Sequence, residues 1–466
     1  MLVKEPDSFN SLIYTCKGNN KIAYKTKTNN ISYDTFFKDI ISAQKIILQT
    51  FSSQNIILSL KPSYEWIVLY FGLQLAGKTV ILADDNLPNE KLIELCKQYK
   101  TSIVINSFNK NDLKNIISHQ DFLLNNHIEE YSALTQNNLH ISTVIFTSGT
   151  SEITPKGVAL SEAGLLSSAF YGHRAANVKP ADTLLHVLPF HHAFGLAAEV
   201  IAPIMSKTTL CFGDNLGTFI SDINHFKVTA IYAVPQIIQG LLFYLKKKEL
   251  PTLKKITNGS APLNKETVDS ILSYDLELHL SYGLSECSPC VAVSKSINTF
   301  DEYYSGEILP CCEVIISPSN EIYISGSNVM MGYYNGTNLS KNNFSNGLFH
   351  SGDTGYLMNN KLYVTGRFKD ILVFNNGKKY NKTFFENKIL KATNSRECYV
   401  FTSEDRLNII LYKPEEMFDL KTIIEAMPQG IKLGDVYERF DTLAKTKLKK
   451  IVNSPEIQLL NCKKIN

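Results

Sequence analysis

The sequence has little of what marks several common classes of protein. Its 47 lysines and arginines barely exceed its 44 aspartates and glutamates, which leaves a net charge of only +3. So small and dispersed a charge gives no electrostatic reason to expect a nucleic-acid partner. The cysteines number nine, an odd count spread over 466 residues, which does not suggest a disulfide framework. Residues 1–7 lack the apolar core of a signal peptide. We therefore expect a protein of the cytoplasm.

Two other patterns, one typical of a zinc site and one of a membrane span, are incomplete. Cys287 and Cys290 form a CxxC pair, but no second pair or paired histidines stand nearby to complete a tetrahedral zinc site. They are expected to be buried free thiols. The most apolar stretch, residues 66–83, is interrupted by Gln74 and Lys78. That pattern is typical of a helix followed by a buried strand, and no membrane span is expected.

Composition and periodicity predict a folded chain of the α/β class. Hydrophobic residues make up 44% of the sequence and charged residues 20%, as in globular proteins, and the length suggests roughly three folding units. Strand-like runs alternate with helical periods within residues 55–105 and 229–280, which predicts parallel β-α-β units. Residues 291–363 have the short strands and glycine turns of a β-rich subdomain, and the C-terminal part returns to mixed helix and strand. The expected strands are residues 55–60, 79–83, 101–105, 144–146, 229–234, 253–257 and 276–280, and the expected helices are 63–75, 88–99 and 161–170.

A hydroxyl-rich turn follows the apolar run 144–146. Its residues are Thr147, Ser148, Gly149, Thr150 and Ser151, and Pro155-Lys156-Gly157-Val158 comes shortly after. Such a turn offers backbone N–H groups and hydroxyls to an anion, and the Lys156 ammonium adds a positive charge. It is not a Walker A loop, which needs Gly-x4-Gly-Lys-Ser/Thr. The first segment alone is compatible with an ordinary turn, but the PKGV sequence behind it favours a phosphate-binding loop.

These two segments resemble the adenylate-forming superfamily, which comprises acyl- and aryl-CoA synthetases, stand-alone adenylation domains and luciferases. The chain is most similar to the acyl-CoA synthetases, and the resemblance extends over nearly all of it because further motifs recur in the family's order. The family's loop usually reads TSGT-T-G-x-PKG. Here residues 151–154, Ser-Glu-Ile-Thr, make the loop one residue longer and leave out that glycine. Glu152 therefore puts a carboxylate beside the expected polyphosphate.

Residues 188–195 look like the family's P-x-x-H-x-x-G segment, with His192 at the histidine position. The resemblance implies that His192 is a catalytic residue near the acid's carboxylate, where a neutral imidazole can donate a hydrogen bond and fix the orientation. A His-His pair is by itself commonly solvated or hydrogen-bonded, and His191 is given no further role. Relatives that activate amino acids carry an aspartate here for the α-ammonium, and this chain has none. Since an unpartnered buried cation is costly, we expect a substrate without an α-amine.

Two turns are similar to the family's nucleotide-binding segments. Residues 258–263 resemble the turn that contacts adenine, and residues 281–286 match Y-G-x-T-E with serine in place of threonine. The resemblance implies that Tyr282 stacks on adenine, that Ser285 bonds a phosphate and that Glu286 is a catalytic ligand of Mg²⁺. Locally, a serine and glutamate that cap a helix would fit as well. The cofactor-binding residues expected in these turns are Gly259, Ser260, Ala261, Tyr282, Gly283 and Ser285.

A carboxylate and a basic junction follow. Residues 350–355 look like the T-G-D motif, and the resemblance implies that Asp353 accepts hydrogen bonds from both ribose hydroxyls. Residues 366–370 resemble the G-R-x-K/D-D junction, so Arg367 is expected at the ribose and Lys369 at a hinge. The implied domains are 1–366, which binds the nucleotide, and 367–466, a small mobile domain.

Near the C-terminus, residues 444–451 resemble P-K-T-x-x-G-K-I, although Ala444 replaces the proline and Lys449 the glycine. Lys450 aligns with the catalytic lysine, whose ammonium bridges the acid and the α-phosphate. By itself this basic run is typical of a solvated helix face. Its position in the family's order of motifs favours the catalytic role instead. Only a short segment follows Lys450, so we expect no carrier domain within the chain.

The resemblance implies an AMP-forming acid–thiol ligase that uses ATP and Mg²⁺. It would join a small carboxylic acid to coenzyme A through an acyl-AMP intermediate. Two alternatives remain open at this point. A stand-alone adenylation enzyme would load the acid onto the phosphopantetheine of an acyl carrier protein. A nucleotide-binding homologue without turnover is favoured by Glu152, by Lys449 and by the missing loop glycine.

Overall fold

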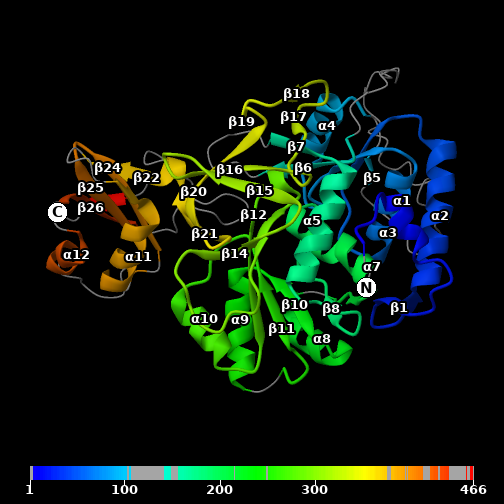
Figure 1. The fold of residues 1–466 in the computed structure, drawn as a ribbon, viewed down its shortest axis with the longest axis horizontal. Helices are drawn as coiled ribbons and strands as arrows, with labels where there is room; N and C mark the ends of the chain where they lie inside the picture. The colour runs from blue at the N-terminus through cyan, green and yellow to red at the C-terminus, as the bar shows by residue number, and fades with distance from the viewer. Residues whose placement is uncertain are drawn as a thin grey trace.

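The computed structural model describes residues 4–101, 104–105, 141–147, 156–214, 216–247, 250–374, 379–393, 395, 397–412, 420–428, 431–439, 458 and 462–464. In these residues the strands form one sheet of 14 strands, one of seven, one of four and one of two. Helices lie against the two large sheets, and the elements that follow η6 gather in a lobe of their own (Figure 1). The expected α/β fold class is thereby confirmed.

The seven-stranded sheet is built mainly from the first third of the chain. Its order is β18 (Leu339–Ser340), β17 (Gly332–Tyr334), β7 (Lys156–Leu160), β6 (Thr143–Thr147), β4 (Thr79–Leu82), β3 (Asn55–Leu58) and β5 (Val104–Ile105). Strands β5, β3, β4 and β6 run parallel, whereas β7 and β17 are antiparallel additions. The predicted β-α-β units are therefore present here, and a segment from far along the chain completes the sheet.

The 14-stranded sheet joins a parallel half to an antiparallel half. The parallel half contains β12 (Glu277–Gly283), β11 (Lys255–Asn258), β10 (Ala230–Ala233), β8 (Thr183–Leu185), β9 (Thr209–Cys211) and β1 (Ile22–Lys25), with β2 (Asn30–Ser32) antiparallel at the edge. The antiparallel half contains β13 (Cys290–Val293), β14 (Tyr304–Ile308), β21 (Lys361–Arg367), β20 (Leu348–Met358), β16 (Glu321–Gly326), β15 (Cys312–Ile316) and β19 (Phe344–Ser345). Strand β12 belongs to both halves, so its end lies where the two architectures meet.

The C-terminal part has its own small sheets. Strands β22 (Ile371–Val373) and β23 (Lys379–Asn381) form a hairpin, and a second sheet holds β24 (Glu397–Ser403), β25 (Arg406–Tyr412), β26 (Lys432–Arg439) and β27 (Cys462–Lys464). Helices α11 (Lys382–Thr393) and α12 (Leu420–Ala426) accompany them. Their buried side chains form a separate hydrophobic cluster around Phe385, Val400 and Ile409. This cluster is the sort of independent core expected of a domain.

The helices described in the larger part of the chain begin either at a capping side chain or without one. They are α1 (Phe9–Tyr14), α2 (Tyr33–Thr50), α3 (Tyr64–Leu75), α4 (Asn89–Gln98), α5 (Glu162–Ala175), α6 (Ala193–Gly195), the π-helix η3 (Leu196–Ile201), α7 (Ala202–Ser206), η4 (Leu216–Thr218), α8 (Phe219–Phe226), α9 (Pro235–Lys246), α10 (Lys265–Leu272), η5 (Ser285–Cys287) and η6 (Phe368–Asp370). The Ser63 and Ser161 hydroxyls accept a backbone N–H in the first turn of α3 and α5, and Asn264 does so for α10. Such caps satisfy donors that have no partner inside the helix.

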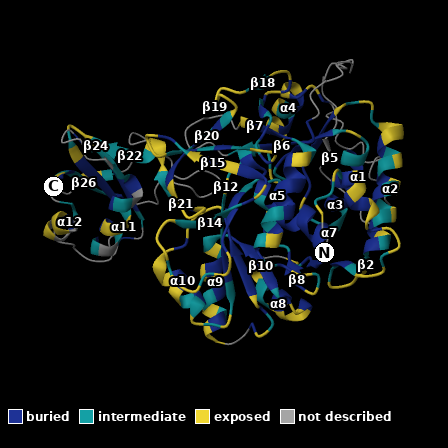
Figure 2. Cartoon of the chain, viewed as in Figure 1, coloured by how far each residue is buried: buried dark blue, intermediate teal, exposed yellow. Residues whose placement is uncertain are grey.

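The apolar stretch 66–83 forms helix α3 and strand β4, as expected. All residues from Trp66 to Leu73 are buried, because α3 lies between the sheet and α2. On the other helices, Figure 2 shows buried residues on the side toward the interior and exposed residues on the outer side. Among the described residues, no helix is long and apolar enough to cross a membrane.

The predicted elements are found with ends shifted by a few residues, with one notable difference. Residues 156–160, for which the sequence predicted no strand, form β7, which pairs antiparallel with β6. Val158, Ala159 and Leu160 are buried, so burial of this short apolar run in the sheet outweighs the turn character of Pro155 and Gly157. Thr147 and Lys156, the described residues on either side of the hydroxyl-rich segment, are therefore paired across β6 and β7.

A buried histidine makes the stability of this fold depend on pH. The Tyr232 hydroxyl lies 2.7 Å from His173 Nδ1, and Ser206 Oγ lies 2.7 Å from His173 Nε2. Both ring nitrogens of this buried imidazole therefore have a hydroxyl partner, which satisfies the neutral ring. Burial lowers the pKa of His173 to about 3 from its ordinary 6.5. Between about pH 3 and pH 6.5, the unfolded chain therefore binds a proton at His173 and the folded chain does not.

We therefore expect His173 to contribute stability that is complete above pH 6.5 and is lost as the pH falls toward 3. The loss amounts to about 1.4 kcal/mol per pH unit. Urea unfolding at pH 7 and pH 5 should show a smaller acid loss for His173→Gln than for the unmodified protein. His225→Gln, which changes an exposed histidine, is the control. Equal slopes for His173→Gln and the unmodified chain would contradict this assignment.

Candidate active site

The densest cluster of predicted residues lies at the end of β12. The Tyr282 hydroxyl donates to Asp353 Oδ2 at 2.7 Å, and Arg367 Nε lies 2.7 Å from Asp353 Oδ1. Asp353 and Arg367 face each other across β20 and β21, so the sheet register brings them together. The Asp353 side chain is 6% exposed and that of Arg367 is 54% exposed. A buried carboxylate thus meets a guanidinium that reaches solvent.

The neighbours of Asp353 donate to its carboxylate and fix its direction. Burial, and after it the Asp353 charge, raises the pKa of Tyr282 well above its ordinary value, so the phenol stays protonated and donates. The Ser351 hydroxyl accepts the backbone N–H of Asp353 at 3.0 Å and fixes the backbone of β20 where it presents the carboxylate. Two carboxylate oxygens offer about four acceptor positions. A carboxylate is also the kind of acceptor that the hydroxyls of a ribose require.

A second group surrounds Glu286, which lies in η5 just beyond Tyr282. The Tyr333 hydroxyl donates to Glu286 Oε1 at 2.8 Å, and Lys156 Nζ lies 5.3 Å from the centre of the Tyr333 ring. Tyr333 is placed there because β17 pairs with β7, opposite Val158. A carboxylate with one donated bond keeps lone pairs for a hard cation, so the donor set fits one protein ligand of Mg²⁺.

The turn after β11 adjoins this group. A Cβ at Gly259 would lie 2.6 Å from a carbon of the Phe194 ring and 2.9 Å from Ser281 Oγ, so the glycine is needed for the packing of that ring. The side chain of Asn258 is buried, and its Oδ1 has no partner among the described residues. Ser260, which follows Gly259, has a φ of +69°, in the left-handed region. It lies in the turn at the carboxyl end of the parallel strands. This arrangement is compatible with a flat ring laid against the turn.

Close packing also explains Gly283. A Cβ there would overlap the backbone carbonyl of Pro289, so any side chain would displace the strand. The structure therefore gives this predicted cofactor-binding residue a packing role of its own. Ser285, in the same segment, begins the single-turn helix η5.

The carboxylate of Glu199 anchors the start of the segment 188–195. No motif identified this residue from the sequence. Glu199 is 1% exposed, and its carboxylate accepts the backbone N–H groups of Val187 and Leu188 at 3.1–3.2 Å and bonds His186 Nδ1 at 2.8 Å. Burial raises the pKa of Glu199, and the bonds from His186 and the backbone oppose that rise. His192 follows and is the N-cap residue of α6. Glu199 thus holds the loop that presents His192.

Tyr333 is a second residue of the site that could not be identified from the sequence. Its sequence signal, Gly332-Tyr333-Tyr334, is only a short β-like run. Its neighbours Glu286 and Lys156 are distant in the chain, and only the pairing of β17 with β7 shows that it joins them. Neither periodicity nor motif spacing contains that information.

Several predicted residues fall outside this description. Ser148, Gly149, Thr150 and Ser151 of the expected phosphate loop lie outside the described residues, as does Lys450. The ends of that loop are placed, because Thr147 and Lys156 are paired in the β6–β7 hairpin. Lys369 lies in η6, directly after Arg367, with an exposed side chain.

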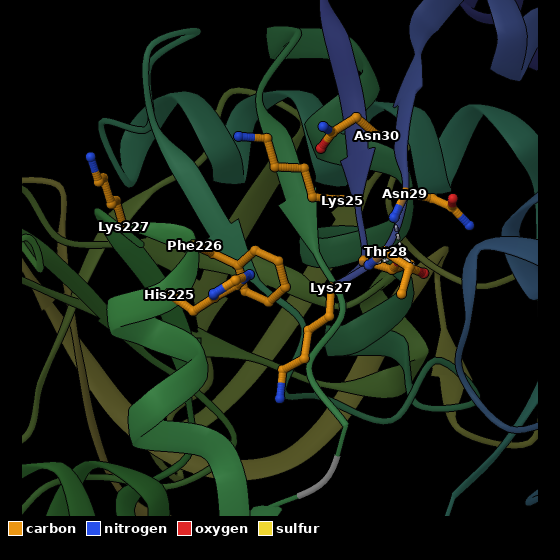
Figure 3. Close-up of a pocket in the computed structure, with 9 residues that line it drawn as sticks. Lys25, Lys27, Thr28, Asn29, Asn30, His225, Phe226 and Lys227 are labelled. Carbon is orange, nitrogen blue, oxygen red and sulfur yellow. Dashed lines mark hydrogen bonds between the residues drawn. The ribbon is translucent and has the colours of Figure 1, made fainter.

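A polar pocket elsewhere has no part in this site. It has a volume of about 370 Å³ and is lined by residues 25–30 at the β1–β2 hairpin and 225–227 at the end of α8 (Figure 3). Lys27 Nζ lies 2.6 Å from Asp214 Oδ2 and 2.9 Å from Asp222 Oδ1, so that charge is already paired. Lys227 stands at the C-terminus of α8, where a cationic side chain is stabilised. None of the predicted site residues lines the pocket.

Comparison with known proteins places the chain among relatives. A family model described as AMP-binding enzyme matches residues 17–334. A 2-succinylbenzoate–CoA ligase of Bacillus velezensis is 30% identical over 277 residues, which are 57% of this chain and 56% of that protein. A long-chain-fatty-acid–CoA ligase of Homo sapiens is 24% identical over 368 residues, 63% of this chain and 50% of that protein. The chain thus spans about half the length of the curated relatives it matches.

Solved structures share the fold over the whole chain. The o-succinylbenzoate CoA synthetase MenE from Bacillus subtilis, in complex with the acyl-adenylate OSB-AMP, has a TM-score of 0.79 at 20% identity and covers 100% of both chains. ATP-bound MatB from Rhodopseudomonas palustris has a TM-score of 0.78 at 18% identity and covers 96% of this chain and 97% of MatB.

Proposed function

The chain belongs to the AMP-binding enzyme family, and from this premise we propose that it activates a carboxylic acid with ATP. The products of this first step are acyl-AMP and pyrophosphate, and the acyl group then passes to a thiol. The observation that carries the proposal is the Asp353 carboxylate, buried between the Tyr282 hydroxyl and the Arg367 guanidinium with Glu286 close by. A polyol acceptor and a cation ligand beside a flat ring are the groups a nucleotide requires.

The nucleotide would be held by residues from several elements. Asp353 would accept the ribose hydroxyls, and the ring of Tyr282 would lie against adenine, which the turn 259–261 borders on its other side. Ser285 and the hydroxyls and N–H groups of residues 147–151 would face the phosphates, with Lys156 contributing charge. Mg²⁺ bound by Glu286 would neutralise phosphate oxygens. Tyr333 would orient Glu286 through the bond at 2.8 Å.

The first step brings two anions together, because a carboxylate attacks the α-phosphate. Catalysis then depends on neutralisation and alignment, and no general base is required since the nucleophile is already ionised. In this proposal Lys450 places its ammonium between the two groups. His192 donates a hydrogen bond to the acid and fixes its orientation, and Glu199 supports it from below.

The second step would use the junction at residue 367. We assign residues 1–366 to nucleotide binding and residues 367–466 to a small domain that turns about Lys369, withdraws Lys450 and admits the thiol. The separate hydrophobic cluster of the C-terminal part supports this division. Coenzyme A is the proposed acceptor, since the similar curated proteins carry the names of CoA ligases.

Replacement of Lys369 by proline should separate the two steps. The side chain is exposed, so little packing is lost, but proline fixes φ near −65° and stiffens the junction. Acyl-AMP formation should stay near the level of the unmodified enzyme while thioester formation falls strongly. Lys369→Ala, which keeps the backbone free to rotate, is the matched control. Equal losses in both steps would count against rotation at this residue.

The substrate proposed is a carboxylic acid without an α-amine, because residues 188–195 contain no acidic side chain to pair with an ammonium. The function is tested by ATP–pyrophosphate exchange over a panel of acids that differ in chain length and aromaticity. We expect exchange with at least one of them, and then AMP release on addition of coenzyme A. If ATP raises the melting temperature but no acid supports exchange, the protein binds nucleotide without turnover. Release only with a phosphopantetheinylated carrier protein would favour that acceptor.

A further inference from the structure

One histidine of the His-His pair has a set of neighbours unrelated to the nucleotide. Asp84 and Asp85 come one residue after the end of β4, and His191 precedes α6, far along the chain. One ligand atom from each residue lies within 4.8 Å of the other two. Two carboxylates and an imidazole thus converge from two segments of the chain. Among the described residues, this is the one group of three or more such side chains that meets so closely.

The spacing suits a metal ion. Protein ligands bind Mn²⁺ or Zn²⁺ at about 2.0–2.2 Å, so two ligands of one ion are at most about 4.4 Å apart, and a small side-chain rotation closes the remaining gap. One imidazole with two carboxylate oxygens is a donor set for divalent first-row transition metals, while Mg²⁺ and Ca²⁺ prefer oxygen alone. Water would complete the coordination, because Asp85 is exposed and His191 is half-buried.

The surrounding structure already orients one of the ligands. Asp84 Oδ1 accepts the backbone N–H of Asn86 at 2.9 Å and its side-chain amide at 3.3 Å, and the Asp84 carbonyl accepts the Ser59 hydroxyl at 2.9 Å. Both segments are also tied to their own elements, β4 on one side and the loop supported by Glu199 on the other. Such outer contacts fix the direction of a ligand before the ion arrives.

We propose that Asp84, Asp85 and His191 form a binding site for a divalent transition-metal ion, separate from the Mg²⁺ that accompanies the nucleotide. The ion would link the end of β4 to the loop that carries His192. An alternative that needs no metal is a hydrogen bond from the imidazole N–H of His191 to one of the two carboxylates. The proposal does not depend on the proposed enzymatic activity, since the site needs neither ATP nor acid.

Electron paramagnetic resonance with Mn²⁺ tests the proposal on the nucleotide-free full chain. We expect about one Mn²⁺ to bind per chain. The affinity for Mn²⁺ should fall at least roughly tenfold in His191→Gln and in Asp85→Asn. Nitrogen hyperfine coupling to the bound Mn²⁺ should be present in the unmodified protein and absent in His191→Gln. His225→Gln and Asp275→Asn, which change exposed residues elsewhere, should bind as the unmodified protein does.

Glu286→Gln separates this site from the nucleotide-associated one, and it should retain the binding. Asp85 is exposed, so Asp85→Asn keeps the test valid even if His191→Gln disturbs the loop. No Mn²⁺ bound by the unmodified chain, or equal binding by all the variants, would overturn the proposal. Loss of binding in Glu286→Gln alone would also overturn it, because the ion would then lie at the nucleotide site.

Discussion

Replacement of Lys450 by alanine should reduce acyl-AMP formation at least roughly a hundredfold, the usual effect of removing one group that stabilises transition-state charge. In our proposal its ammonium acts where a carboxylate and a phosphate meet, a charge arrangement that is strongest in the transition state. Binding of ATP alone should be nearly unchanged, since Asp353, Tyr282 and Glu286 hold the nucleotide. Exchange kinetics and equilibrium dialysis with ATP measure the two effects on the same preparation.

The neighbouring lysine provides the control. Lys449→Ala removes the same charge one position away, where the family usually has glycine, and should have little effect on exchange. An unchanged rate in Lys450→Ala would remove this residue from its role. Equal losses in both variants would point to the basic run as a whole and not to one aligned ammonium.

The second large effect is expected at Asp353. Asp353→Asn keeps the shape of the side chain but removes the charge that pairs with Arg367 and the capacity to accept two ribose hydroxyls. Hydrogen bonds to a charged group contribute about 1.5–3 kcal/mol each, so loss of two should weaken ATP binding by roughly a hundredfold or more. Isothermal titration with ATP, and with AMP to exclude effects of the outer phosphates, measures this loss.

Two variants show whether the effect is specific. Tyr282→Phe keeps the ring and removes only the donor, so we expect a much smaller loss of affinity than in Asp353→Asn. Asp301 accepts the Tyr363 hydroxyl at 3.1 Å in a similar pair outside the cluster, and Asp301→Asn should leave binding unchanged. If Asp353→Asn unfolds as the unmodified protein does and still binds ATP equally well, the ribose lies elsewhere.

The outline of the fold and part of the site could be predicted from the sequence because local patterns contain that information. The strand–helix alternation of residues 55–105 appears as β3, α3, β4 and α4, since each run buries its own apolar face. Tyr282 and Asp353 were expected in one site because each lies in a motif, and the structure joins them at 2.7 Å.

The remaining features depend on contacts between distant segments. Gly259 is required by the ring of Phe194, and Tyr333 reaches Glu286 only through the pairing of β17 with β7. Glu199 is an acidic residue in an apolar run, and its role is visible only when the backbone N–H groups around it are placed. His191 and the two aspartates show the same limit, since no spacing in the sequence relates them.

Isotope transfer tests the central claim most directly. The acid that supports exchange is labelled with ¹⁸O in its carboxyl group and converted to the thioester by the full chain with ATP and coenzyme A. If the carboxylate attacks the α-phosphate, the carbon–oxygen bond breaks in the second step and one ¹⁸O remains in AMP, with none in pyrophosphate. Mass spectrometry that finds the label in inorganic phosphate beside ADP would show attack at the γ-phosphate and contradict the account.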